Sequence, residues 1–500
     1  MYSQILINVE ADETRVALLE DNQLVEFYLE RGAASRLSGN IYKGKIEDVL
    51  PGMQAAFVNI GLNRNAFLFV GDITDRYISE TNVKSLAPAP SILRKIEEII
   101  KKGEHILIQV YKEPIEQKGA RITTNIAISG KLLVYMPLAP HIGISHRIID
   151  PKERERLRNI VMSIQEKEEG FIIRTQAINC KEEEILEEIY ELRKKWQDIL
   201  DKLGKIKKSG LVYQELPLSE IVVRDLLTED INRVYVDDKE EYENICENVK
   251  NNKKHIRDRI TLYEEQEPIF EKFNVENQIT KALTRRINLK SGGYLIFDQT
   301  EALTSIDVNT GGFIGIDALE NTAFEINQEA IQKIAIQIRL RNLGGMIIID
   351  LIDMKEQEHR KRIKEEFENL LKRDRCKTQI VKLSELGLIE LTRKRVGKSL
   401  THLLMDYCPF CSGGGRIYSS ITMCNQVKRM LGKEIGYGNK KLVVQTNQYY
   451  TPLLKKDETL LEFIEETAIE VEFQAIMDVP FNFLKVLPQT DYRNSSIGSA

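Results

Sequence analysis

Five hundred residues, of which 42% are hydrophobic and 29% charged, are too many for one compact core and predict a soluble chain of several domains. No apolar run approaches the ~20 residues of a membrane helix, and acidic residues precede the first basic one, which is unlike a signal peptide. Six cysteines, only two of them closely spaced, form no disulfide framework, so we expect a cytoplasmic protein. A net charge of −5 argues against a uniformly basic surface, yet Lys372–Lys398 holds nine basic and three acidic residues, which leaves room for a local nucleic-acid contact.

The N-terminal third reads as short strands. Apolar and polar residues alternate over the first thirty positions, and Gly39–Val70 is a run of short strand patterns separated by glycine corners. The pattern resumes at Ile106–Val110. Many short strands joined at glycines predict a small β-barrel.

An aromatic and basic group falls on this barrel. Phe57 and Phe67 lie on neighbouring strands, and Lys112 and Lys118 lie just beyond the last one. Aromatic rings on such barrels stack on single-stranded bases, and lysines neutralise phosphates. The alternative is that both phenylalanines are core residues, which is the commoner position of a phenylalanine.

Residues 119–214 change to a mixed α/β pattern. Leu132–Tyr135 and Phe171–Thr175 read as strands, one helix is expected near Pro151, and a longer one over Lys181–Leu203. Arg174 and Thr175 end the second strand, and a guanidinium beside a hydroxyl could bind a terminal phosphate. A surface arginine satisfied within the protein is the alternative for this pair.

The clearest architecture is a strand–helix–strand unit. Tyr294–Asp298 and Leu303–Val308 predict a hairpin, and a helical pattern over residues 326–338 then leads to the apolar strand Met346–Asp350. Such a unit makes its two flanking strands parallel and buried.

Acidic residues end these two parallel strands. Asp307 and Asp350 close them, and Asn309 follows Asp307 by two positions. Residues at the carboxyl ends of adjacent strands converge, and two carboxylates placed together favour a shared cation such as Mg²⁺. The alternative is that both aspartates only cap turns.

Two further aspartates nearby read as structural. Asp353 begins a D-x-x-E pattern typical of a helix capping box, and Asp298 lies at the hairpin corner.

Cys408 and Cys411 are spaced as half of a tetrahedral zinc site. No second pair follows, so either Cys424 and His402 complete the site within one chain, or two chains contribute one pair each. A redox disulfide is a third alternative, but the surrounding pattern is not thioredoxin-like.

The ordered motifs resemble those of the ribonuclease E/G family of bacterial endoribonucleases. The resemblance covers about residues 1–415 and rests on residues 40–45, 54–58, 118–120, 173–175, 305–309, 340–345, 349–354 and the Cys408 motif. Residues 307–313, and a chain without a long Pro- and Arg-rich extension, are most similar to the shorter, G-type members.

The resemblance implies a multidomain α/β fold. It would comprise an RNase H-like domain (1–37 and 215–278) interrupted by an S1 (OB-fold) barrel (38–118) and a 5′-sensor domain (119–214). A DNase I-like catalytic subdomain (279–400), a zinc link (401–415) and a small C-terminal α/β domain (416–500) would follow.

The resemblance also implies roles for individual residues. Asp307 and Asp350 would hold Mg²⁺, and Asn309 would orient the site. Cys408 and Cys411 would share one Zn²⁺ between two protomers. The residues that would contact RNA are Phe57, Phe67 and Lys118, and those that would bind a 5′-monophosphate are Gly130, Val134, Arg174 and Thr175.

One position departs from the family pattern. Lys377 stands where the family's sensor region has an arginine. Lysine keeps the charge but lacks the planar fork, which predicts looser discrimination of the 5′ end.

We therefore expect a Mg²⁺-dependent endoribonuclease that cleaves single-stranded RNA, prefers 5′-monophosphate ends, and acts in ribosomal RNA maturation and RNA turnover. A homodimer joined by zinc, and possible pairing of two dimers, are expected with it. A non-catalytic RNA-binding protein that uses the S1 barrel is the alternative function.

Overall fold

A computed structural model describes residues 2–32, 37–79, 82–85, 95–114, 119–228, 230–250, 257–311, 319–384, 387–411 and 413–489. The chain divides into two compact units, Met1–Leu403 and Leu404–Ala500. In the part of the chain that the structure describes, no helix is long and apolar enough to cross a membrane.

The first sheet joins the N-terminus to a segment more than two hundred positions away. Its strand order is β17-β16-β1-β2-β3, and β1 pairs with β16 in parallel. Helices α4 and α5 pack on one face through the core that contains Ile5, Val222 and Ile245. The elements are β1 (Ser3–Val9), β2 (Glu13–Glu20), β3 (Gln23–Arg31), α4 (Leu218–Leu226), β16 (Ile231–Val236), α5 (Lys239–Lys250), β17 (Ile260–Leu262), α7 (Ile269–Lys272) and α8 (Val275–Leu283).

Between these two segments lies a five-stranded barrel. Strands β4, β5, β6, β10 and β9 follow one another, and pairing of β4 with β9 closes the ring, which confirms the predicted barrel. Gly44 permits the close approach of two strands, because a Cβ there would lie 2.5 Å from Val58 Cγ1. The elements of the barrel and its extensions are β4 (Ile41–Leu50), η1 (Pro51–Met53), β5 (Ala55–Asn59), β6 (Ala66–Phe69), η2 (Val70–Asp72), β7 (Arg76–Ser79), β8 (Asn82–Ser85), α1 (Ile96–Ile99), β9 (His105–Lys112), β10 (Arg121–Thr123) and β15 (Gly210–Tyr213).

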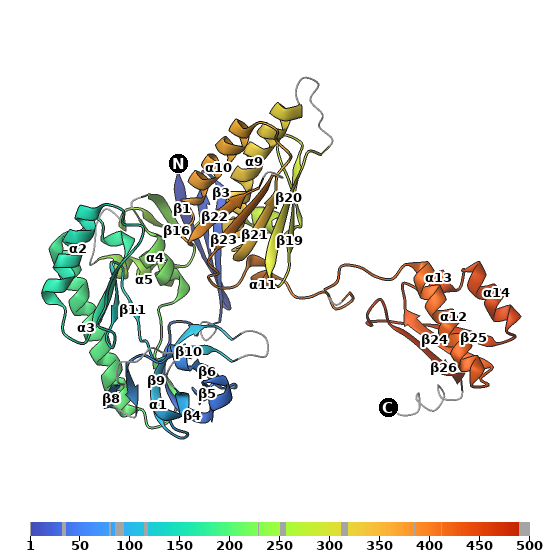
Figure 1. The fold of residues 1–500 in the computed structure, drawn as a ribbon, viewed down its shortest axis with the longest axis horizontal. Coiled ribbons are helices and arrows are strands. Elements are labelled where there is room, and N and C mark those ends of the chain that lie inside the picture. The colour runs from blue at the N-terminus through green and yellow to red at the C-terminus, as the bar shows by residue number, and fades with distance from the viewer. Residues whose placement is uncertain are drawn as a thin grey trace. The chain divides into compact units, whose positions relative to one another are not determined.

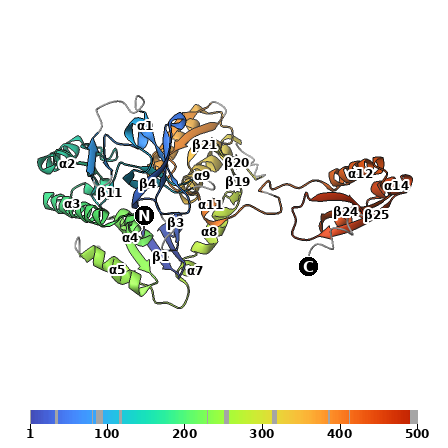
Figure 2. The same ribbon diagram turned by 90° about the horizontal axis from the view of Figure 1, so that it is seen from below.

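A four-stranded sheet, ordered β11-β12-β14-β13, follows the barrel in sequence. Both predicted helices are present, and they lie side by side against it (Figures 1 and 2). The first begins at Pro151, where the carboxylate of Asp150 accepts a hydrogen bond from the Lys152 N–H. The elements are β11 (Ile128–Ser129), β12 (Leu133–Met136), β13 (Ile142–Ile144), α2 (Pro151–Ile164), β14 (Gly170–Ile173), η4 (Thr175–Ala177) and α3 (Glu182–Lys205).

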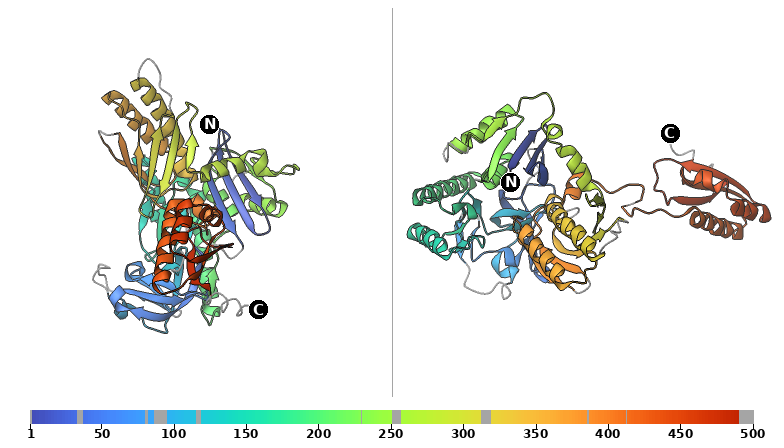
Figure 3. Two further views of the ribbon diagram at one scale, coloured as in Figure 1. Left: turned by 90° about the vertical axis from the view of Figure 1, so that its right-hand side faces the viewer. Right: turned by 90° about the horizontal axis from the view of Figure 1, so that it is seen from above.

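The largest α/β layer of the first unit is the sheet β18-β19-β20-β21-β23-β22. The predicted hairpin and parallel unit are confirmed, since β19 and β20 are antiparallel and β20 and β21 are parallel. Helices α9 and α10 run side by side on one face (Figure 3) and share its core. The elements are β18 (Arg286–Asn288), β19 (Tyr294–Gln299), β20 (Leu303–Asn309), α9 (Leu319–Leu340), β21 (Gly345–Asp350), α10 (Gln357–Leu371), β22 (Thr378–Leu383), β23 (Leu388–Arg393) and α11 (Leu400–Leu404).

The second unit is a three-stranded sheet, β25-β24-β26, packed against helices. Phe410 anchors the cysteine loop to it, because its ring lies 5.7 Å from that of Phe481 and its carbonyl accepts the Phe481 N–H at 3.0 Å. The elements are α12 (Ser420–Gly436), β24 (Lys441–Asn447), α13 (Thr451–Leu454), α14 (Glu458–Glu466), β25 (Glu470–Ile476) and β26 (Leu484–Pro488).

A buried ion pair fixes the end of β23. Arg393 donates through Nε to Asp374 Oδ2 at 2.6 Å and through Nη2 to Oδ1 at 3.2 Å, and the two side chains are 4% and 2% exposed. Burial alone would raise the pKa of Asp374, but hydrogen bonds and the charge of Arg393 outweigh it, so this pKa is lowered. The carboxylate therefore stays charged in the interior.

We expect Asp374→Asn to lower the free energy of unfolding by about 3 kcal/mol or more, because it leaves the Arg393 charge buried without a counter-ion. Urea denaturation followed by circular dichroism and by the fluorescence of Trp196 measures the change. The matched control is Asp298→Asn, which breaks the exposed pair with Arg285 and should cost less than about 1 kcal/mol. Equal losses in the two variants would contradict this account. The contribution of Asp374 should be present above the ordinary aspartate pKa and disappear as the pH falls through its lowered native pKa.

Candidate functional site

The two candidate metal-binding aspartates lie opposite each other on adjacent strands. In the parallel register of β20 and β21, Asp307 is the cross-strand partner of Asp350. Both are exposed, whereas Ile306 and Ile349 beside them are buried in the core shared with the helices. Because side chains alternate between the faces of a strand, the two aspartates share the face that the helices leave open. The structure thus brings together the residues that the strand pattern placed together.

The electrostatics of this group favour a cation. The pKa of Asp350 is raised, first by partial desolvation and then by the negative charges of Asp307 and Asp353. Asn309 Nδ2 donates a hydrogen bond to Asp307 Oδ2 at 2.8 Å, which fixes that carboxylate. Carboxylates on one face repel each other unless a proton or a cation lies between them. This oxygen donor set fits a hard divalent ion such as Mg²⁺.

The capping-box prediction for Asp353 is wrong. Helix α10 begins at Gln357, and Asp353 lies outside it. The N–H groups of Lys355 and Glu356 are bound instead by the carboxylate of Glu320, at 2.8 and 3.0 Å. A side chain of another helix, α9, therefore accepts the hydrogen bonds that a local cap would accept. Asp353 instead lies near Asp350, and its negative charge helps to raise the pKa of Asp350. Asp298 is structural as expected, paired with Arg285 at 2.5 Å.

The cysteine pair presents its sulfurs to backbone donors. Hydrogen bonds from the backbone of Cys411 and Phe410 lower the pKa of Cys408, and the Gly415 N–H lies 3.3 Å from Cys411 Sγ. Thiolates are the form that binds zinc, so this loop fits half of a zinc site.

Cys424 and His402, which could complete a zinc site within one chain, each have other partners in the structure. Cys424 is buried on α12, and burial together with Asp457 raises the pKa of its thiol to about 11. His402 shares a hydrogen bond of 2.7 Å with Ser399. Among the described residues, no three or more histidine, cysteine or acidic side chains gather as a metal site.

An aromatic and cationic row crosses the barrel. Phe57 is paired with Phe67, Phe67 with Arg121 and Arg121 with Lys112 on successive strands. The rings of Phe57 and Phe67 meet edge to face at 6.1 Å, and Phe57 is 36% exposed. Both phenylalanines therefore lie on the outer face of the barrel, where bases could reach them.

Two members of this surface, Phe69 and Arg121, carry no sequence signal that points to them. Phe69 is 37% exposed on the same face of β6 as Phe67, and Arg121 lies 6.0 Å from the Phe69 ring. Lys112 is exposed as expected, 5.8 Å from the ring of Tyr111. Lys118 lies outside the described residues.

The candidate 5′-sensor residues are brought together at one end of the strands of the four-stranded sheet. Arg174 Nη1 donates to the Gly130 carbonyl at 2.6 Å, and Thr175 Oγ1 lies 3.1 Å from Ser145 Oγ. Val134 lies on β12 between its partners Ser129 and Ile172. A Cβ at Gly130 would lie 1.9 Å from Glu188 Oε1, so a larger residue would have to displace the Glu188 carboxylate from its hydrogen bonds to the Leu132 and Leu133 N–H groups.

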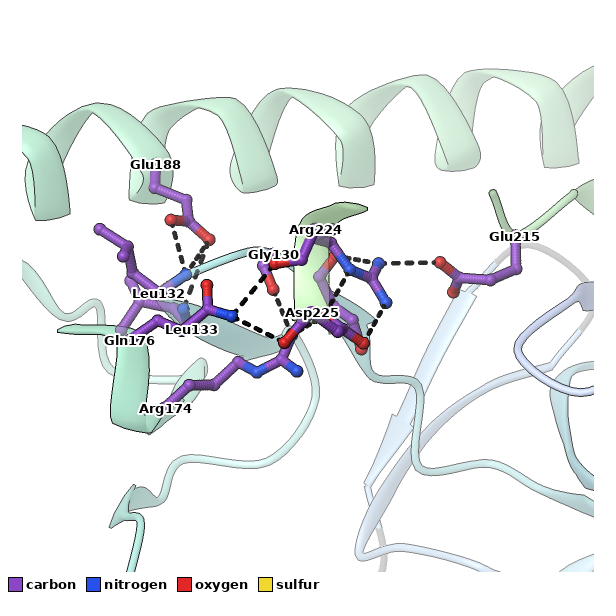
Figure 4. Close-up of polar contacts among 10 residues, drawn as sticks. Gly130, Leu132, Leu133, Arg174, Gln176, Glu188, Glu215, Arg224 and Asp225 are labelled. Carbon is purple, nitrogen blue, oxygen red and sulfur yellow. Dashed lines mark hydrogen bonds and ion pairs between the residues drawn. The ribbon is translucent and has the colours of Figure 1, made fainter. Parts of the chain in front are cut away.

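Further charged residues lie at this end of the sheet (Figure 4). Glu188 accepts the Leu132 N–H at 2.9 Å, and Asp225 pairs with Arg174 at 2.9 Å. Neither acid carries a local sequence signal, because each lies more than forty positions from its partner. Lys377 is exposed and directly precedes β22, which is an edge strand of a different sheet, the one that contains β20 and β21.

Comparison with known proteins decides the family. A model described as the Ribonuclease E/G family matches residues 127–396. Ribonuclease G of Escherichia coli (strain K12) is 40% identical over 460 residues, covering 92% of this chain and 94% of that protein. The chain belongs to the ribonuclease E/G family.

Two other relatives show the extent of the similarity. Ribonuclease G of Haemophilus influenzae is 41% identical over 428 residues, covering 85% of this chain and 86% of that protein. Ribonuclease E of the same organism is 33% identical and covers 88% of this chain but 47% of that protein. As a member of the ribonuclease E/G family, the protein is an endoribonuclease.

Proposed function

We propose that this endoribonuclease cleaves single-stranded RNA with Mg²⁺ held by Asp307 and Asp350, leaving 5′-phosphate and 3′-hydroxyl products. The observation that carries the proposal is the register of β20 and β21, which makes the two aspartates direct cross-strand partners. We further propose a preference for 5′-monophosphate ends and a role in ribosomal RNA maturation and RNA turnover.

Each residue of the proposed metal site would have a separate role. Asp307 and Asp350 would bind the ion, and Asn309 holds one Asp307 oxygen in place through its amide. Asp353 adds negative charge beside Asp350, which strengthens the attraction for a cation. Bound Mg²⁺ would supply charge neutralisation in the transition state and a water of lowered pKa. The rigid strands keep these oxygens in fixed positions before substrate arrives.

We also propose the finer architecture that the family resemblance implies. Residues 1–37 and 215–278 would be RNase H-like, and the closed barrel would be an S1 domain. The sheet that contains β11 to β14 would be the 5′-sensor, the sheet that contains β20 and β21 would be DNase I-like, and residues 401–415 would form a zinc link.

Cleavage of one short, A/U-rich single-stranded RNA, with either a 5′-phosphate or a 5′-hydroxyl and with or without Mg²⁺, tests the reaction. We expect Asp307→Asn and Asp350→Asn each to slow cleavage at least about a hundredfold, because charge stabilisation by a metal contributes several kcal/mol. RNA affinity, measured by fluorescence anisotropy, should stay near that of the unmodified protein.

The matched control is Asp298→Asn, which changes an exposed aspartate on neighbouring strand β19 and should leave the rate unchanged. Full activity of both site variants would overturn the assignment of the metal ligands. Equal rates with and without Mg²⁺ would overturn the choice of ion.

We propose that RNA crosses the barrel over the row that contains Phe57 and Phe67, with Lys112 and Lys118 neutralising phosphates. Stacking on an aromatic ring contributes about 1–3 kcal/mol per base. We therefore expect Phe57→Ala to weaken binding of single-stranded RNA by about five- to a hundredfold, measured at one fixed salt concentration. Tyr190→Ala removes an exposed ring from α3 and serves as the control. Equal affinities of the two variants would refute the stacking role.

We propose that Cys408 and Cys411 hold one Zn²⁺ jointly with the same pair of a second chain, which makes the protein a homodimer. The lowered pKa of Cys408 and the two-sulfur loop support this assignment, and tetrahedral zinc needs two more ligands.

Metal analysis should find half an equivalent of zinc per chain, and light scattering should find a dimer. Cys408→Ser should lose the zinc and convert the dimer to a monomer, because one side of the shared site would then lack its ligand. Cys424→Ser, at a buried thiol of high pKa, should keep both. One full equivalent per chain, or loss of zinc in Cys424→Ser, would support a site within one chain instead.

A further inference from the structure

The guanidinium of Arg174 is held by one of its three nitrogens. Nη1 donates to the Gly130 carbonyl at 2.6 Å and pairs with Asp225 Oδ1 at 2.9 Å. Within the described ranges, neither Nε nor Nη2 of Arg174 has a hydrogen-bond partner in the protein. The Arg174 side chain is 26% exposed, so it is not enclosed within the protein interior.

The edge formed by Nε and Nη2, which the protein contacts leave unused, is the one that suits a phosphate. A guanidinium binds an anion best through two parallel N–H groups, and Nε and Nη2 provide such a pair. Because both protein acceptors use Nη1, an incoming phosphate would not have to displace Asp225. The acidic side chain therefore acts as a support for Arg174 and does not compete with the phosphate.

Asp225 is itself fixed in place (Figure 4). Arg224 Nε donates to Asp225 Oδ1 at 2.9 Å, and Arg224 Nη1 reaches Glu215 Oε1 at 3.1 Å. The amide of Gln176 binds the backbone carbonyls of Arg224 and Asp225 at 3.2 and 3.0 Å. Burial would raise the pKa of Asp225, but the two arginines outweigh it and lower this pKa. The support is thus both rigid and charged.

We propose that Asp225 is a positioning residue for recognition of the 5′ end: it orients Arg174 so that the Nε and Nη2 edge meets a terminal monophosphate. This inference rests on the proposed 5′-monophosphate preference. It assigns this role to α4, whose last turn carries Asp225. The carbonyl of Gly130 is a single acceptor at Nη1, and Asp225 is the second contact that orients the guanidinium.

The test compares kcat/KM of the full-length protein, in its native assembly, on the same short single-stranded RNA with a 5′-phosphate or a 5′-hydroxyl. We expect Asp225→Asn to reduce the ratio of the two values about tenfold, through a higher KM for the phosphorylated RNA, because a charge-assisted contact is weakened. Cleavage of the 5′-hydroxyl RNA should not change.

Two further variants make the test specific. Asp225→Glu keeps the charge that Arg224 requires but moves the carboxylate by one methylene, so it should retain the fold and still lose discrimination. Asp201→Asn, at an exposed aspartate on α3, is the control and should keep the ratio. In an Arg174→Ala background, Asp225→Asn should cause no further loss of discrimination, as expected of a residue that acts through Arg174.

The outcomes separate this inference from the proposed function. Discrimination by the unmodified protein that persists in Asp225→Asn would overturn the role of Asp225 and leave the 5′-end preference intact. An equal loss of rate on both RNAs would show a structural role only and would also overturn it. No discrimination by the unmodified protein would overturn the 5′-end preference and this inference together.

Discussion

The parallel pairing of β20 with β21 is the constraint on which the proposed chemistry depends. A shift of one residue would turn Asp350 to the opposite face of the sheet and put Ile349 in its place. The register is held by apolar burial, because Ile306, Ile347 and Ile349 are at most 1% exposed beneath the helices. Desolvation, and then the charges of Asp307 and Asp353, raise the pKa of Asp350. The core therefore holds the two carboxylates in a register that their mutual repulsion opposes, and the hydrogen bond from Asn309 to Asp307 is the local support.

Buried charges connect this sheet to the rest of the first unit. Arg339 on α9 pairs with Glu20 and Glu26 of the first sheet at 2.8 and 2.9 Å. Such pairs add little net stability compared with apolar contacts, but an unpaired partner is costly, so they strongly disfavour other arrangements. They link residues more than three hundred positions apart, and they fix the position of α9 against β3. The helix that covers the candidate catalytic sheet is thereby tied to the sheet formed by the chain's N-terminus.

The sequence predicted those parts of the site whose signal is local. The hairpin, the following helix and the apolar strand ending at Asp350 each carry a clear hydrophobic period, and together they dictate a parallel pair. Asp353 shows where this reasoning stops. Its spacing from Glu356 fits a capping box. The N–H groups before α10 are bound instead by Glu320 of another helix, so a tertiary contact replaces the local motif. Asp225 belongs to no sequence motif, because it meets Arg174 only once the chain has folded.

The charges around Arg174 alternate in sign, so charge alone could not locate the candidate sensor residues. Arg174, Asp225, Arg224 and Glu215 alternate in sign along one chain of contacts, so their formal charges cancel. An anion approaching this group meets no large net positive field, and its binding depends on donor geometry at short range. The chain of contacts also ends on the barrel, because the Glu215 N–H is bound by Asn40 Oδ1 at 2.9 Å, just before β4. A continuous series of contacts therefore runs from the barrel through α4 to Arg174. Under the proposed function, the donor geometry that these contacts give to Arg174 would distinguish the two RNA ends.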